Sequence, residues 1–151
     1  MNSIIDPAFG EMEYDHSWVK KESIFLFGKS YEIRIAAEAY TGQEILDVQR
    51  QSYERYKSEY PDYIAKIPDV LLDYYISNYD SIASAVDIPE KINRENITRD
   101  LIVKLIRVKT VYFDRNGQYG WLCDCAWDDE HGISIILSTE EIFVAEQDYL
   151  L

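Results

Sequence analysis

Alternating apolar and polar residues predict β-structure near the start of the chain. Residues 24–27 form a short apolar run, a Gly-Lys-Ser turn follows at 28–30, and apolar residues then alternate with charged ones over 31–39. A period of two with one polar face is typical of a half-buried strand, and the glycine in the connection predicts a hairpin. We expect an earlier strand around residues 9–14, and Trp18 fits a further one.

The middle of the chain has the helical period instead. From Ile45 to Tyr60, apolar and aromatic residues recur every three or four positions with charged residues between them. Thr41-Gly42-Gln43-Glu44 fits a capping box at the start of this helix. Pro61 and Pro68 each suit the first turn of a new helix, so we expect breaks or kinks at both and a last helix that ends in the low eighties.

A loop and a second set of strands complete the pattern. Residues 87–96 indicate a loop, and Thr98 can cap a short helix after it. From Val108 the apolar alternation resumes, and Asn116-Gly117 is a strong hairpin signal within it. Further strands are expected at about 118–127, 133–138 and 141–146.

These elements predict a single α+β domain over residues 1–151. Antiparallel strands at both termini, an N-terminal hairpin or meander and a C-terminal meander, pack with a central helical block. The pattern does not decide whether the two sets of strands share one sheet.

Charge narrows the classes of partner. Twenty-eight acidic and fifteen basic residues give a net charge of −13, which repels phosphate backbones and disfavours a nucleic-acid partner. Residues 115–151 hold eight acids and one base; this region either complements a basic protein surface or keeps the protein soluble. With neither a signal peptide nor an apolar run of about 20 residues, we expect a cytoplasmic protein without a membrane partner.

The segment 116–132 gathers the residues that most suggest chemistry. On a strand, Trp121, Cys123, Cys125 and Trp127 share one face. Thiols two residues apart on a regular strand lie at or beyond disulfide reach. We interpret both cysteines as small buried hydrophobes; the alternatives are a reactive thiol or a metal site with His131, although the chain lacks a second ligand pair.

The acidic residues that follow, Asp128-Asp129-Glu130-His131-Gly132, have two interpretations. Clustered carboxylates suit a divalent cation, but a connecting turn in which Gly132 supplies an unusual dihedral is favoured. His16 shares strand parity with Tyr14 and Trp18, which predicts aromatic packing. The sequence contains no catalytic motif that we can assign, and we predict no catalytic residue and no cofactor.

Tyrosines are concentrated in the helical block. Seven of the thirteen lie between Tyr53 and Tyr79, and tyrosine is favoured at interfaces because it joins a large apolar ring to a polar tip. Tyr74 and Tyr75 are adjacent on a helix and cannot both face the same core. Either these tyrosines pack the helices on the sheet, or some of them form a recognition surface.

Several stretches carry a resemblance to a known family. They are residues 9–29, Ala39-Tyr40-Thr41-Gly42-Gln43-Glu44, Tyr119-Gly120-Trp121-Leu122-Cys123-Asp124-Cys125-Ala126-Trp127-Asp128 and Gln147-Asp148-Tyr149-Leu150. Together they resemble an uncharacterised bacterial family, a domain of unknown function, of small acidic cytoplasmic proteins. In size, acidity and strand-helix-strand layout, such proteins are similar to the immunity proteins of bacterial toxin systems.

Two main hypotheses for function follow. The first is a non-enzymatic protein-binding domain, an immunity-type neutraliser of a basic toxin or similar partner, whose candidate contacts are Tyr53, Tyr56, Tyr74, Tyr75, Asp128, Asp129 and Glu130. The alternative is a metal-binding protein or metal-dependent enzyme that uses Cys123, Cys125 and His131. Self-association as a homo-oligomer fits the same observations.

Overall fold

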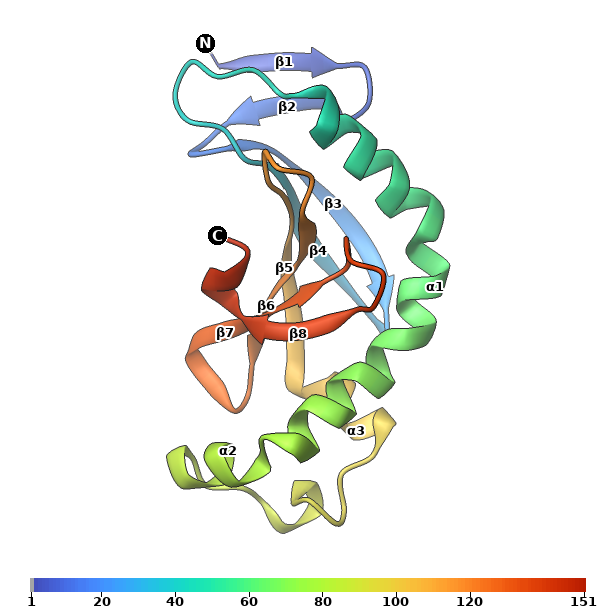
Figure 1. The fold of residues 1–151 in the computed structure, drawn as a ribbon, viewed down its shortest axis with the longest axis vertical. Helices are drawn as coiled ribbons and strands as arrows, with labels where there is room; N and C mark the ends of the chain where they lie inside the picture. The colour runs from blue at the N-terminus through green and yellow to red at the C-terminus, as the bar shows by residue number, and fades with distance from the viewer. Residues whose placement is uncertain (1) are drawn as a thin grey trace.

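The computed structural model describes residues 2–151, apart from the side chain of Asp129. These residues contain one eight-stranded sheet whose strands lie in chain order (Figure 1). The strands are β1 (Ser3–Asp6), β2 (Gly10–Tyr14), β3 (Trp18–Leu26), β4 (Lys29–Ala37), β5 (Ile106–Phe113), β6 (Tyr119–Cys125), β7 (Asp128–Ile136) and β8 (Phe143–Glu146). The predicted α+β class, with antiparallel strands at both termini around a helical block, is confirmed.

A single parallel pairing unites the two sets of strands. β1 to β4 form one antiparallel meander and β5 to β8 form another. β4 and β5 pair in parallel, with Arg34–Ala37 beside Thr110–Phe113. A parallel pair needs a long crossover connection, and the helical block supplies it. The question that the sequence left open is therefore answered: both sets belong to one sheet.

The helical block consists mainly of one long helix. The helices are α1 (Asp47–Ser77), α2 (Tyr79–Ala85), η1 (Glu90–Ile92), α3 (Arg99–Ile102), η2 (Val103–Leu105) and, at the C-terminus, η3 (Gln147–Tyr149). In Figure 1, α1 curves along the sheet from the β1–β2 end to α2 and α3 at the other end. The short helix after Thr98 is confirmed, and the Thr98 hydroxyl accepts a hydrogen bond from the Leu101 amide.

We expected breaks or kinks at the prolines, and within the described residues the helix runs through both without a break. Pro61 and Pro68 both lie inside α1, and the chain leaves the helix at Asn78 instead. Pro61 is exposed, on the side of the helix away from the sheet. A helix that wraps a core curves with its convex side toward solvent, where its hydrogen bonds are longest. Packing along the opposite face therefore keeps the helix continuous despite the two missing amide donors.

The predicted capping box at Thr41 is also wrong, because α1 begins at Asp47. Residues 40–46 instead form a non-helical connection that contains a tight turn, in which the Gln43 amide donates to the Tyr40 carbonyl over 3.0 Å and Gly42 has a φ of 84°. The Trp18 indole donates to the Gln43 carbonyl over 2.8 Å, and the Arg115 guanidinium donates to the Glu44 carbonyl over 3.0 Å. These bonds use backbone groups that a helix would need, so the helix starts later.

Two turns also differ from expectation. The β3–β4 turn is formed by Phe27 and Gly28, which both have positive φ, and β4 begins at Lys29. His16, expected to pack among aromatic rings, lies in the β2–β3 turn with φ 66° and a side chain 98 % exposed. Tight turns between paired strands require residues in the left-handed conformation. The conformation of these residues is therefore set by the turn and not by the alternation of apolar and polar positions along the strand.

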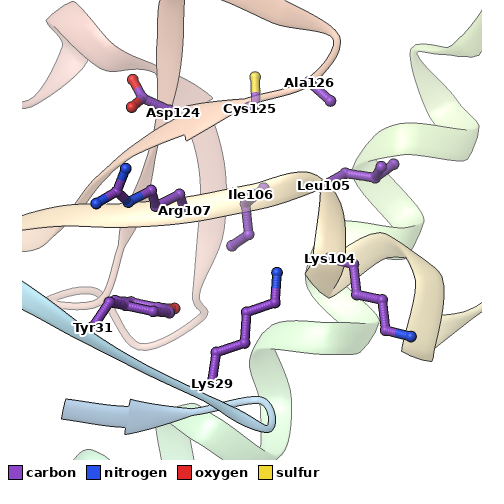
Figure 2. Close-up of a pocket in the computed structure, with 9 residues that line it drawn as sticks. All are labelled: Lys29, Tyr31, Lys104, Leu105, Ile106, Arg107, Asp124, Cys125 and Ala126. Atoms are coloured by element: carbon purple, nitrogen blue, oxygen red, sulfur yellow. The ribbon is translucent and has the colours of Figure 1, made fainter.

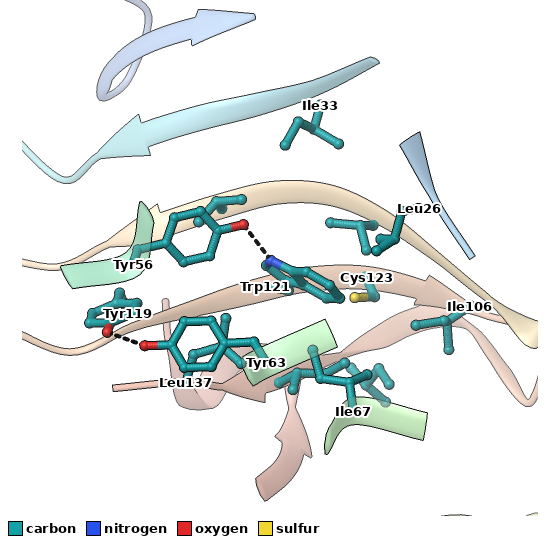
Figure 3. Packing of buried hydrophobic residues seen from close by; sticks show 14 of the residues in the cluster. Leu26, Ile33, Tyr56, Tyr63, Ile67, Ile106, Tyr119, Trp121, Cys123 and Leu137 are labelled. Carbon is teal, nitrogen blue, oxygen red and sulfur yellow. Dashed lines mark hydrogen bonds between the residues drawn. The ribbon is translucent and has the colours of Figure 1, made fainter. Parts of the chain in front are cut away.

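Aromatic side chains fill the space between α1 and the sheet (Figure 3). The predicted parity of β6 is confirmed, since Trp121, Cys123 and Cys125 all face this core. Trp121 is fully buried, and its indole donates to the Tyr56 hydroxyl of α1 over 3.0 Å. Buried indole and phenol groups need such partners. The tyrosines of α1 therefore provide both apolar area and hydrogen bonds to the core.

Gln49 is a buried polar residue at the end of the β4–β5 pairing. Its side-chain amide donates to the carbonyls of Glu38 and Phe113, over 2.9 and 3.2 Å. Its side-chain oxygen accepts from the Leu46 amide over 2.8 Å. One side chain thus satisfies backbone groups at the start of α1 and at the ends of both parallel strands.

We predict that Gln49→Leu lowers the free energy of unfolding by about 2–3 kcal/mol, because it removes three hydrogen bonds: it leaves the partly buried Leu46 amide unpaired and takes one of two donors from each of the Glu38 and Phe113 carbonyls. Urea unfolding monitored by tryptophan fluorescence measures this loss. Gln43→Leu is the matched control: the Gln43 side chain accepts from the Tyr40 amide in an exposed setting, so it should cost no more than about 0.5–1 kcal/mol. Equal losses of stability in the two variants would contradict the role of Gln49 in binding backbone groups at the strand ends and at the start of α1.

Candidate functional site

A groove of about 590 Å³ lies where the C-terminal half of α1, α2, the start of β7 and the end of β8 meet. α1 and α2 form one wall, and the chain from Trp127 to Ile133 forms the other. The sequence placed several candidate residues on these two segments, which are far apart along the chain. The crossover between the two meanders brings them to the same end of the sheet.

The groove has an apolar floor and an acidic rim. Ile82, Trp127 and Ile133 are buried beneath it. Three carboxylate residues line it, Asp128, Glu130 and Glu146, and no lysine or arginine of the described residues does. A concave site with an apolar base and a few placed polar groups is the usual form of a binding site. An acidic rim of this kind produces a negative local potential.

The acidic segment 128–132 is strand rather than the connecting turn that we expected. β7 begins at Asp128, which pairs with Cys125, and the turn is formed by Ala126 and Trp127. Gly132 does have a positive φ of 70°, but it lies within β7, where a Cβ would come within 2.3 Å of the Cys123 carbonyl oxygen. The unusual dihedral is used to fit a close backbone approach inside the sheet.

Asp128 and His131 form a pair at the mouth of the groove. The Asp128 carboxylate accepts from the His131 backbone amide and lies 3.0 Å from His131 Nδ1. The hydrogen bond and the negative charge of Asp128 raise the pKa of His131 above its ordinary value of 6.5. The imidazole is 74 % exposed. Near neutral pH its protonation therefore controls how much negative charge the rim presents.

Of the four candidate tyrosines, Tyr74 is the one that reaches the groove. It is half-buried, and its pKa is raised chiefly by burial and also by the negative charges of Glu146 and Asp128. Its hydroxyl therefore stays protonated and neutral. Tyr75 turns to the core and donates to the Ile92 carbonyl over 3.0 Å. The expectation that this adjacent pair faces two different environments is confirmed.

The remaining tyrosine candidates are corrected by the structure. Tyr53, Tyr56 and Tyr75 are only 4, 6 and 0 % exposed, so their rings pack α1 on the sheet and do not form a recognition surface. Asp129, the other acidic candidate, has a side chain outside the described part of the structure. Tyr74, Asp128 and Glu130 remain as predicted residues that line the groove.

Sequence reasoning missed Glu146 and Trp127 as groove residues. Glu146 ends β8 and pairs with Ile133 of β7, which carries its carboxylate to the rim. Its place in the acidic C-terminal region was the only signal available. Trp127 was assigned to the core by parity, and it is indeed buried, with its ring against Tyr75.

Both cysteines are free and buried beside the core tryptophan. Burial raises the pKa of Cys123 well above its ordinary value and raises the pKa of Cys125 to about 12. The Cys125 thiol donates to the Asp128 carbonyl over 3.6 Å. A nucleophile or a metal ligand must be a thiolate, and neither environment favours one.

The third candidate metal ligand lies apart from the thiols. His131 is exposed at the rim and pairs with Asp128, while the thiols face the interior. Among the side chains that the structure describes, no three His, Cys, Asp or Glu groups are placed to share a metal ion. This geometry provides no observation in favour of the metal-dependent alternative.

A comparison with models of protein families identifies one match for this chain. The model of a domain of unknown function, DUF6985, matches residues 8–150. The chain belongs to the DUF6985 family. No curated protein and no solved structure matches this DUF6985 chain. Within residues 2–151, none of its helices combines the length and the apolar composition needed to cross a membrane.

We predict that neither thiol of the native DUF6985 domain reacts with a thiol reagent such as DTNB at neutral pH, and that two thiols per chain react in denaturant. The reason is burial together with the raised pKa of both groups. Absorbance during labelling counts the thiols. Fast labelling of one cysteine in the folded protein would contradict this assignment and indicate a reactive site.

Proposed function

We propose that this domain is a non-enzymatic protein-binding module that takes a basic segment of a partner protein into the groove between α1–α2 and β7. The observation that supports this best is the meeting of Tyr74 with Asp128, Glu130 and Glu146 around one apolar floor. Aromatic faces and carboxylates together suit a guanidinium or ammonium group, through cation–π attraction and charge-assisted hydrogen bonds.

The overall charge supports the same type of partner. The net charge of −13 is concentrated in residues 115–151, which include β6, β7 and β8. Such a field speeds the encounter with a basic protein and disfavours an acidic one. Long-range attraction and the local groove therefore favour the same class of partner.

We further propose an immunity-type role in a bacterial cytoplasm, in which the bound partner is a basic toxin. Neutralisation of this kind needs no chemistry from the binder, only occupation of the partner's surface. The test is whether co-expression of the domain relieves the toxicity of the protein that it captures.

The groove is tested by reversing its charge. We expect Asp128→Lys combined with Glu130→Lys to weaken binding of the captured basic partner on the order of 100-fold, since like charges brought together cost several kcal/mol. Glu140→Lys combined with Glu141→Lys is the matched control: both residues are exposed, lie outside the groove lining, and change the net charge equally. Affinity is measured by calorimetry on the purified pair.

The control separates a local from a general electrostatic effect. A partner that binds the control with near wild-type affinity, and the groove variant weakly, supports the groove. Equal loss in both variants would mean that net charge alone drives the association, and equal retention would place the contact elsewhere on the molecule. The proposal fails in either case.

Binding should also depend on pH through His131. Because Asp128 raises the pKa of His131 above 6.5, the imidazole is protonated below that raised value, neutralises Asp128 and repels an incoming cation. Affinity should therefore increase as the pH rises from about 6 to about 8, a range in which ordinary carboxylates stay ionised. His131→Gln should flatten this part of the pH profile. An unchanged profile in that variant would exclude His131 as its source.

A further inference from the structure

A second cavity lies where β4 and β5 separate. Their parallel pairing covers only Arg34–Ala37 and Thr110–Phe113. Before that point, residues 29–33 of β4 pair only with β3, and residues 106–108 of β5 pair only with β6. A cavity of about 370 Å³ occupies the widening gap, as Figure 2 shows.

This cavity gathers three cations that form no ion pair with a carboxylate among the described residues. Nine of the fifteen lysines and arginines form an ion pair with an aspartate or glutamate within the described residues. Lys29, Lys104 and Arg107 are not among those nine, and all three line the cavity. In a chain with almost two acids per base, three uncompensated cations around one cavity need an explanation.

The walls of the cavity are suited to a compact ligand. In Figure 2, Lys29 extends from the start of β4 into the gap toward Ile106, and Arg107 lies along β5 below Asp124. Tyr31 and Ile106 supply apolar surface between them. The one carboxylate in the lining, Asp124, lies opposite Arg107 in the β5–β6 ladder, and its charge is already matched by Lys109 at 3.2 Å.

We propose that this cavity binds a small phosphate-bearing anion, with Lys29 and Arg107 as its main contacts and Lys104 at the rim. A phosphate group offers several acceptor oxygens to cations that approach from different sides, and a guanidinium can bind two of them at once. The net charge of the whole chain opposes an anion at long range. Binding therefore depends on these local contacts and weakens with added salt.

This site is independent of the acidic groove. Cys125 and Ala126 border the cavity, whereas Trp127 and Asp128 border the groove. The two sites, of opposite charge, thus lie on either side of the β6–β7 turn. Loss of one function by mutation should leave the other intact, so the two proposals are tested separately.

The test uses calorimetric titration of the full chain with inorganic pyrophosphate, with AMP and with a hexaglutamate peptide at low ionic strength. We expect saturable binding of pyrophosphate or AMP at one site per chain, weakened about tenfold or more by Lys29→Gln combined with Arg107→Gln. Lys66→Gln combined with Lys91→Gln is the matched control, because these lysines are also exposed and outside the ion pairs of the described residues. The control should bind as the wild type does.

Three results would overturn the proposal: no saturable binding of either phosphate compound, equal weakening in the control variant, or tighter binding of the hexaglutamate peptide. The last would identify the cavity as a contact for an acidic protein segment. Asp124→Asn adds an opposite expectation. Removing the one carboxylate at the cavity should tighten pyrophosphate binding, and weaker binding would contradict an anion at this position.

Discussion

The four-residue parallel pairing of β4 with β5 is the constraint on which the rest of the structure depends. Each half of the sheet is a meander whose strands pair through short connections, and such pairing is local. Joining the halves in parallel requires the chain to leave the sheet, cross one face and return. Residues 38–105 make that crossing, and they cover the core while they do so. Gln49 stabilises this junction through hydrogen bonds to backbone groups at the ends of both strands and at the start of α1.

Both candidate sites arise from how this joint is made. Because the pairing is short, β4 and β5 separate before it, and their side chains surround a basic cavity. Because the crossover is long, its helices end beside the start of β7 and form an acidic groove there. The β6–β7 turn separates the two. Residues of opposite charge therefore line two separate sites on either side of this turn.

The local sequence pattern predicted most of the helices and strands well. It predicted poorly the features that depend on contacts between residues distant in sequence. The Asn116-Gly117 hairpin and the parity of Trp121, Cys123 and Cys125 depend on neighbours in sequence, and both were predicted. The capping box at Thr41 failed because Trp18 and Arg115 bind backbone carbonyls of that segment, which a helix would need, and these residues are distant in sequence. The basic cavity could not be foreseen, since it depends on where a parallel pairing stops. The groove was half foreseen: Tyr74, Asp128 and Glu130 were candidates from the sequence, whereas Glu146 reaches the groove only through the pairing of β8 with β7.

Pro61 and Pro68 lie within α1, the helix whose C-terminal end lines the groove. A straight helix of the length of α1 would extend about 45 Å, and it would diverge from a twisted sheet. Pro61 removes an amide donor on the exposed side, where a curved helix is already most open. α1 curves along the sheet in Figure 1, and towards its C-terminal end the Tyr75 ring packs on Trp127. Its neighbour Tyr74 lines the groove. A helix that continues through both prolines thus carries Tyr74 to the wall of the groove opposite Asp128 and Glu130.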